Sequence, residues 1–268
     1  MVMARIVTWN VNSIRTRLPR LEAFLKRADP DVVCLQEIKA TEDQFPFKEV
    51  ESFGYEALVS GQKTYNGVAI LAKSGIKLAD PTSKIGFQEG DLEARFMETR
   101  IKDVTIMSVY VPNGAAVGDI KFDFKLRFLE GLYKYLQAKF SDEDKVLVTG
   151  DFNIAPEDID AFDPEGWKEQ LLVSTAERDA LRQILSLGYS DVFRQFDSGG
   201  GKYSWWDYRN LAFNLNRGLR IDLILASAPM AKICTSCSID RDERRTPKNA
   251  SKPSDHAPVV ADFKLKFS

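Results

Sequence analysis

The chain has 268 residues, of which 44% are hydrophobic and 28% are charged, and its formal net charge is −2. These values are typical of a soluble globular protein with a sizeable core, and the charge argues against a broadly basic surface while still allowing a local basic groove. No apolar run is long enough to span a membrane, and residues 6–9 read as a strand rather than a signal peptide, so we expect a cytoplasmic protein with no membrane partner.

Strand-like and helix-like segments alternate along the first half of the chain. Residues 6–9 predict a strand, and Leu18, Leu21 and Leu25 follow it at helical spacing. Apolar or alternating runs predict further strands at 32–35, 67–71 and 104–111. A long amphipathic helix comes next, and its apolar stripe over residues 128–140 indicates core packing.

The second half continues the same pattern. We predict a strand at 146–149, a helix at about 175–187 that stops at Gly188, strands at 203–208, 219–225, 232–239 and 258–265, and surface loops at 199–201 and 241–252. Because strands outnumber helices, the sequence favours two packed sheets with helices outside them over one doubly wound sheet. We expect residues 1–268 to form one domain.

Three cysteines, an odd number, do not indicate a disulfide framework. Cys234 and Cys237 form a Cys-x-x-Cys motif, but no second pair completes a zinc site. Residues three apart in a strand point to opposite faces, so we interpret both cysteines as structural.

His256 is the only histidine in the chain, and it lies next to Asp255 just ahead of the last predicted strand. It is therefore the one imidazole available for acid–base chemistry near neutral pH. A lone histidine is more often structural, so its interpretation depends on polar residues elsewhere.

Other polar residues recur where predicted strands end, which is where α/β proteins place their sites. They are Asn10, Glu37, Tyr110, Asn113, Asp151, Asn153 and Asp222. Each alone is equally consistent with a turn. Together they suit phosphoester cleavage, in which Glu37, helped by Asn10 or Asp255, offers the hard oxygen ligands that Mg²⁺ prefers.

The remaining groups suit the transition state of such a reaction. Asn153, Asn113, Tyr110 and a protonated His256 are donors for phosphate oxygens. Asp151 is suited to orient or deprotonate a water molecule. Asp222 is suited to hold His256 in one tautomer and keep it charged.

Six motifs in order carry a resemblance to a known family. They are TWNVNSIR (8–15), LQEIK (35–39), YVPNG (110–114), GDFN (150–153), RID (220–222) and SDH (254–256). This set resembles the exonuclease III and AP endonuclease family of base-excision repair, within the endonuclease/exonuclease/phosphatase superfamily. Residues 61–69 and the segment SWWDYR (204–209) strengthen the resemblance to the DNA-repair branch.

The resemblance implies a four-layered α/β sandwich, two packed mixed β-sheets flanked by helices, with the site between the upper ends of the sheets. It implies Mg²⁺, or Mn²⁺ in its place, held by Glu37 with Asn10 nearby and Asp255 as a second ligand. Asp151 and Asn153 complete this metal and phosphate set. It also implies that His256, paired with Asp222, stabilises the transition state and that Tyr110 assists. Whether Asp151 or His256 is the general base stays open.

The substrate implied is double-stranded DNA with abasic sites or blocked 3′ ends, bound by a monomer. Incision on the 5′ side of the abasic site would leave a 3′-hydroxyl, with 3′–5′ exonuclease and 3′-phosphatase activity as additions. Arg95, Lys39 and Asn113 correspond to substrate contacts. Trp205 and Leu219 correspond to a small apolar pocket for a flipped-out sugar without its base.

One departure from the family and two alternatives qualify this reading. Residues 115–119 contain no histidine or arginine, which puts strong exonuclease activity in doubt. A phosphatase of the same superfamily acting on a non-DNA substrate would share the metal site. A non-catalytic nucleic-acid-binding relative would keep the fold, but it would normally have lost metal or histidine positions that are all filled here.

Overall fold

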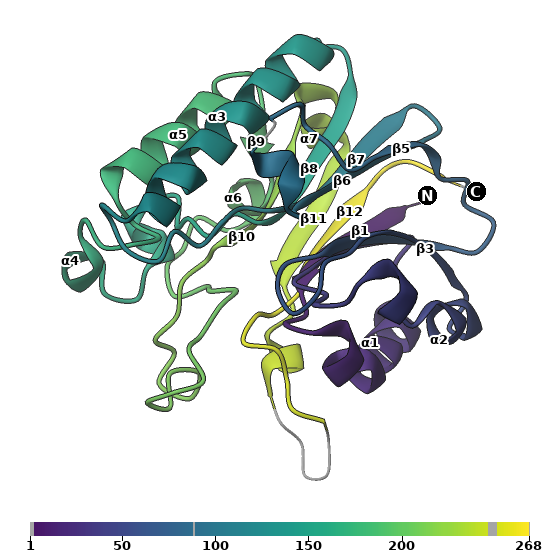
Figure 1. The fold of residues 1–268 in the computed structure, drawn as a ribbon, viewed down its shortest axis with the longest axis horizontal. Helices are drawn as coiled ribbons and strands as arrows, with labels where there is room; N and C mark the ends of the chain where they lie inside the picture. Colours follow the sequence, from purple (N-terminus) through teal and green to yellow (C-terminus); the bar gives the residue numbers. More distant parts are fainter. Residues whose placement is uncertain (1–2, 88, 246–250, 268) are drawn as a thin grey trace.

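Two six-stranded β-sheets pack face to face, and helices cover the outer side of each sheet (Figure 1). The computed structural model describes residues 3–87, 89–245 and 251–267. The order of layers is helix, sheet, sheet, helix, which confirms the predicted four-layered α/β sandwich.

The first sheet has the strand order β11-β12-β1-β2-β4-β3. Its strands are β1 (Ala4–Asn10), β2 (Val32–Gln36), β3 (Tyr55–Ser60), β4 (Val68–Lys73), β11 (Cys234–Ile239) and β12 (Val259–Phe263). Only β1 and β2 run parallel, and the other neighbours are antiparallel. The last strand of the chain therefore lies beside the first.

The second sheet has the order β5-β6-β7-β8-β10-β9. Its strands are β5 (Ala79–Thr82), β6 (Phe96–Ile101), β7 (Val104–Tyr110), β8 (Lys145–Asp151), β9 (Ser190–Asp191) and β10 (Asp222–Ala226). The parallel pair here is β7 and β8. Both sheets are thus mixed, and each holds one parallel pair near its centre.

Four helices in the described residues form the outer layers. Helix α1 (Ile14–Ala28) and α2 (Phe47–Ser52) cover the first sheet, whereas α3 (Ile120–Lys139) and α5 (Thr175–Leu185) cover the second (Figure 1). The shorter helices are α4 (Pro164–Trp167), α6 (Phe193–Phe196) and α7 (Ala228–Ile233), and 3₁₀ turns occur at Glu42–Gln44, Gly90–Leu92, Asp158–Asp160 and Arg241–Arg244. Ser174 caps α5 through a capping box, which fixes where that helix begins.

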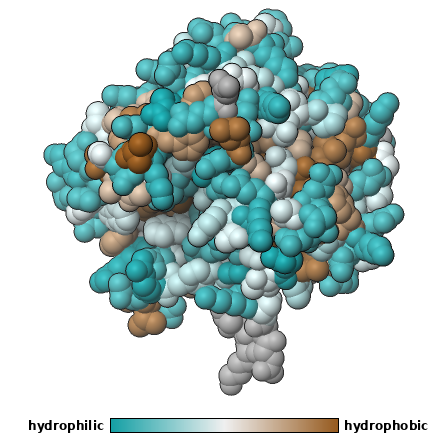
Figure 2. All heavy atoms as spheres, viewed as in Figure 1, coloured by the Kyte–Doolittle hydropathy of each residue, from teal (hydrophilic) through white to brown (hydrophobic). Residues whose placement is uncertain are grey.

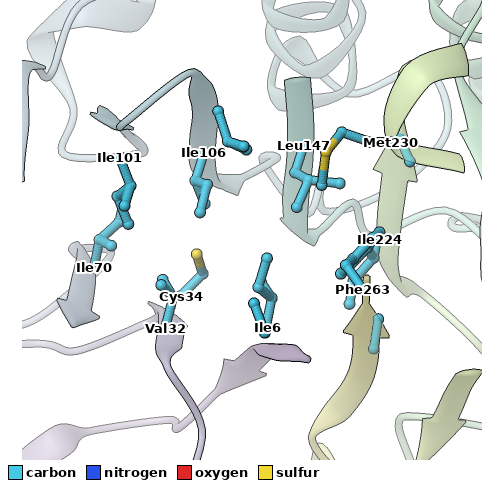
Figure 3. Packing of buried hydrophobic residues seen from close by; sticks show 14 of the residues in the cluster. Ile6, Val32, Cys34, Ile70, Ile101, Ile106, Leu147, Ile224, Met230 and Phe263 are labelled. Carbon is cyan, nitrogen blue, oxygen red and sulfur yellow. The ribbon is translucent and has the colours of Figure 1, made fainter. Parts of the chain in front are cut away.

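Strand alternation assigns side chains to separate cores. In β1, Ile6 faces the second sheet, whereas Val7 and Trp9 face α1. Figure 3 shows Ile6 and Cys34 of the first sheet opposite Ile106 and Leu147 of the second. Because both faces of the central strands are buried, these strands read as continuous apolar runs in the sequence.

Replacing Ile106 with alanine is expected to lower the free energy of unfolding by about 2–5 kcal/mol, because it leaves a cavity between the sheets. Ile106 is fully buried, whereas Ile120, the first residue of α3, is 78% exposed. Ile120→Ala is therefore the matched control, with an expected change within about 0.5 kcal/mol. Urea unfolding measures both, and equal losses would contradict the assignment of Ile106 to the inter-sheet core.

Three predicted strands need correction. Residues 203–208 do not form a strand, because Trp205 makes only isolated bridges to Leu219 and His256 and its neighbours find other partners. The strand predicted at 219–225 begins only at Asp222, and the one at 232–239 begins at Cys234 after α7. In the loop predicted at 241–252, residues 241–244 form a 3₁₀ turn, and 246–250 lie outside the described residues.

No helix among residues 3–87, 89–245 and 251–267 is long and apolar enough to cross a membrane. The face in Figure 2 is mostly hydrophilic, with separate small hydrophobic patches. Scattered apolar side chains of this kind are ordinary on a protein surface.

Candidate active site

Strand register brings the predicted polar residues to one end of the two sheets. Asn10 ends β1 opposite Gln36 of β2, and Tyr110 ends β7 opposite Asp151 of β8. Asp222 begins the antiparallel β10 directly opposite Asp151. Because the two parallel pairs both end here, residues far apart in the chain meet between the sheets.

Asn10 links carboxylates from the two sheets. Its amide nitrogen lies 2.8 Å from Oε1 of Glu37 and 2.8 Å from Oδ2 of Asp151. Glu37 follows β2 in the left-handed conformation, with φ of 49°, which turns its side chain toward this position. The Asn10 oxygen accepts the backbone N–H of Asn12, which sets the orientation of the amide.

Lys39 lies next to Glu37 and compensates its charge. Its Nζ is 2.8 Å from Oε2 of Glu37 and donates to Oδ1 of Asn12 at 2.6 Å. Burial alone would raise the pKa of Glu37, but the Lys39 ammonium and the Asn10 amide hold that pKa below its ordinary value. Glu37 is therefore a stable carboxylate at neutral pH.

His256 connects the two acidic residues of the second sheet. Its Nδ1 lies 2.9 Å from Oδ2 of Asp222, and its Nε2 lies 3.8 Å from Oδ2 of Asp151. Since a carboxylate only accepts hydrogen bonds, Nδ1 carries the proton toward Asp222. The backbone of His256 is held by Ser254 Oγ and by the indole N–H of Trp9.

Burial and neighbouring charges shift the pKa values of both His256 and Asp151. Burial alone would lower the pKa of His256, but the Asp222 and Asp151 carboxylates raise it well above its ordinary value. Burial raises the pKa of Asp151, the Asp222 charge adds to that rise, and His256 opposes it. His256 thus favours the imidazolium form, and Asp151 is a stronger base than an exposed aspartate.

Glu37, Asp151 and His256 form the group of potential metal ligands found in the described part of the chain, with one atom from each within 4.8 Å of the others. An imidazolium cannot coordinate a metal, which leaves the two carboxylates as ligands. Carboxylate oxygens with open neighbouring positions suit a hard divalent cation. The donor set therefore fits the metal that the sequence implied.

Two residues of the predicted metal set have other partners. Asp255 lies outside the three-residue group, because its Oδ1 accepts from Asn12 and its Oδ2 accepts from Trp205 Nε1 at 3.1 Å. The side-chain oxygen of Asn153 faces the Asn113 amide at 3.3 Å. Its backbone N–H donates to Oδ1 of Asp151 at 2.9 Å, so Asn153 orients Asp151.

Tyr110 interacts with Glu37, and Arg95 packs against the Tyr110 ring. The Arg95 guanidinium is 4.9 Å from the centre of the Tyr110 ring and also bonds to Glu93. Burial raises the pKa of Tyr110 strongly, and the Glu37 and Asp151 carboxylates add to this rise. Tyr110 therefore remains a hydrogen-bond donor.

Trp205 and Leu219 form an apolar wall beside Asp255. Their backbones exchange hydrogen bonds at 2.9 and 3.0 Å, and Leu219 is buried with Ile221 in one cluster. Trp205 is half-buried, so part of its ring faces solvent.

Sequence reasoning missed two residues of the site. Asn12 bonds to both Lys39 and Asp255, and it lies within the TWNVNSIR motif without having been assigned a role. Lys125 lies on the buried face of α3 between Phe122 and Phe128. A lysine within an apolar helical stripe is the signal that would have identified it.

Comparisons with known proteins find relatives over nearly the whole chain. The Endonuclease/Exonuclease/phosphatase family profile matches residues 7–256. The chain is 35% identical to exodeoxyribonuclease III of Haemophilus influenzae, over 97% of this chain and 100% of the relative. It is also similar to a 3′ phosphatase from Neisseria bound to a product DNA hairpin (TM-score 0.92, 37% identity, 98% and 100% covered). An AP endonuclease from Archaeoglobus fulgidus gives a TM-score of 0.91 at 36% identity, with 98% and 100% covered.

Proposed function

Because this chain belongs to the Endonuclease/Exonuclease/phosphatase family, we propose that it is a divalent-metal-dependent DNA repair nuclease of the exonuclease III and AP endonuclease group. The observation that carries the proposal is the line of Asp222, His256 and Asp151 beside Glu37. Around one point lie an oriented imidazole and two carboxylates, both of which we propose as metal ligands. These are the groups that phosphodiester hydrolysis requires.

The proposed substrate is double-stranded DNA with an abasic site or a blocked 3′ end, cleaved on the 5′ side of the abasic site to leave a 3′-hydroxyl. The partly exposed Trp205, which packs on the buried Leu219, supports this choice, because a sugar without its base is small enough to be extruded against an apolar ring of this kind. Because the two sheets share one buried core between them, we propose that residues 1–268 act as one catalytic domain, in a monomer.

Glu37 and Asp151 are the proposed ligands of Mg²⁺ or Mn²⁺, and Asn10 orients both carboxylates. When bound, the cation would offset the negative charge of the phosphate. We assign Asp255 and Asn153 instead to holding Asn12 and Asp151 in place through hydrogen bonds.

The other proposed roles, in activating water and in binding the phosphate, belong to side chains of the site. Asp151, oriented by the Asn10 amide and the Asn153 N–H, positions the attacking water and accepts its proton. His256 donates to a phosphate oxygen as negative charge develops there, and Asp222 fixes its ring. Tyr110 and the exposed amide of Asn113 donate to the phosphate, and Lys39 and Arg95 add positive charge beside Glu37 and Tyr110.

A substrate panel with and without EDTA tests this function. We expect rapid incision of abasic duplex, slower release of 3′-phosphate, still slower degradation of blunt duplex, and loss of every activity with EDTA. The slow exonuclease follows from the lack of histidine and arginine in residues 115–119. Glu37→Ala is the control, because it removes a proposed metal ligand. Incision no faster than this control would contradict the proposal.

The same panel separates the alternatives. Tight DNA binding without metal-dependent cleavage would indicate a non-catalytic relative. Turnover of an inositol phosphate or a lipid headgroup, with no activity on DNA, would indicate a phosphatase of the same superfamily.

A further inference from the structure

Lys125 is a charged residue with its side chain fully buried in the layer between α3 and the second sheet. It occupies the apolar face of α3, where Phe122, Leu129 and Leu132 are also buried. Placing an ammonium group there costs solvation free energy unless each of its protons finds an acceptor. Its three acceptors therefore indicate what the residue does.

The ammonium group of Lys125 binds the loops that follow β7 and β8. Its Nζ donates to the backbone carbonyl of Asn153 at 2.7 Å and to that of Asn113 at 3.2 Å. The third acceptor is the buried carboxylate of Glu177. One nitrogen thus joins the two loops that carry the proposed phosphate-binding amides.

Glu177 ties this nitrogen to the start of α5. Its carboxylate accepts the backbone N–H of Leu172 and both the N–H and the hydroxyl of Ser174. Every proton of Lys125 and both oxygens of Glu177 are used, so the network has one arrangement.

The contact with Asn153 bears directly on Asp151. Asn153 has φ of 51°, a left-handed conformation that a residue other than glycine adopts at a cost. In this conformation its backbone N–H points at Oδ1 of Asp151, and its amide donates to the carbonyl of Val111. Lys125 holds the carbonyl of the same residue and so stabilises the turn that aims Asp151.

The neighbouring loop is packed just as closely. Gly114 has φ of +100°, and a Cβ there would lie 3.3 Å from the Lys125 side chain and 3.0 Å from Leu171. Only glycine lets the chain pass this close in this conformation. This close packing keeps the Asn113 carbonyl within hydrogen-bond distance of the Lys125 ammonium group.

We propose that Lys125, paired with Glu177, is a positioning residue that sets the relative placement of Asp151, Asn153 and Asn113 for attack on the phosphodiester. This inference rests on the proposed nuclease function. It assigns to the buried pair a role in aligning the reacting groups rather than in holding the fold together. A buried ion pair contributes little net stability compared with apolar residues of similar size, so a role in stability alone is a weak reason for it.

The test compares Lys125→Met/Glu177→Leu with Lys139→Met. The double variant removes both charges together, which avoids leaving one of them buried without a partner. Lys139 is at the far end of α3, about 21 Å along the helix axis, and pairs with Glu98 of the second sheet. The measurements are the unfolding midpoint and, with abasic duplex and saturating Mg²⁺, kcat and KM.

We expect the double variant to unfold near the wild-type midpoint and to lose about 10²-fold in kcat with KM for DNA nearly unchanged, because a small misplacement of reacting groups acts on the chemical step. Lys139→Met should keep the wild-type kcat. If the double variant does not fold, Lys125→Gln replaces it, since its amide stays polar but offers fewer donors. A folded variant of either kind with the wild-type kcat overturns the proposal.

The activity of the wild-type protein distinguishes failure of the proposed function from failure of the positioning role. Wild type that fails to cleave any DNA substrate with Mg²⁺ contradicts the proposed function itself. Wild type that cleaves, together with an equally active Lys125 variant, contradicts only the positioning role. A crystal structure of the folded variant adds a readout independent of activity, and an unchanged left-handed Asn153 with unchanged contacts to Asp151 would also count against the proposal.

Discussion

Replacing His256 with alanine is expected to lower kcat for the incision of abasic duplex by about 10³-fold, the range that a positioned acid or base contributes. The chain has no second histidine, so no other imidazole can substitute. The ring is buried between Asp222 and Asp151, and its loss removes the one proposed cationic donor from between two carboxylates. Single-turnover cleavage with saturating Mg²⁺ measures the change.

Asp222→Asn separates the charge on His256 from its presence. The Asp222 carboxylate raises the pKa of His256, so its removal lowers that pKa. If the protonated ring is the active form, activity is lost as pH rises through this pKa, and the alkaline limb of the kcat profile moves to lower pH in the variant. An alkaline limb that stays in place would contradict the role of His256 as a charged donor, and a loss of less than tenfold in His256→Ala would contradict its catalytic role.

Replacing Asp151 with asparagine is expected to lower kcat by about 10³-fold or more, because asparagine keeps the size of the side chain but cannot accept a proton from water. The Asn153 N–H and the Asn10 amide both point at this carboxylate, so the site is built around its charge. Asp103→Asn, at an exposed position beside Lys145, is the matched control and should retain full activity.

A Mg²⁺ titration of Asp151→Asn distinguishes its two proposed roles. If Asp151 served only as a metal ligand, high Mg²⁺ would restore the wild-type rate. We expect a lower plateau instead, because the base is still missing at saturating metal. Full recovery at high Mg²⁺ would overturn the assignment of Asp151 as the base.

Much of the fold could be predicted from local patterns. The parallel pairs β1–β2 and β7–β8 read as apolar runs because both of their faces are buried, and α5 is bounded by Ser174 and Gly188. The strand predicted at 203–208, by contrast, was wrong. Its aromatic residues favour a strand, but Trp205 takes part only in isolated bridges, opposite Leu219 and His256, and pairs with no continuous neighbouring strand.

The amino-acid sequence alone establishes which chemical groups this protein has, and the order of its six motifs indicates the family. A single histidine, several carboxylates and amides at strand ends, and no basic excess are properties of composition and local pattern, which need no knowledge of distance.

Which of these groups meet in space depends on the folded chain. Asp255 is next to His256 in sequence but bonds to Asn12 and Trp205, whereas Asp222, 34 residues away, holds the ring. The physical reason is that contacts between sheets depend on strand register and on buried packing. For the same reason the sequence showed Lys125 only as a lysine in an apolar stripe, and the fold placed its ammonium group against the carbonyls of Asn113 and Asn153.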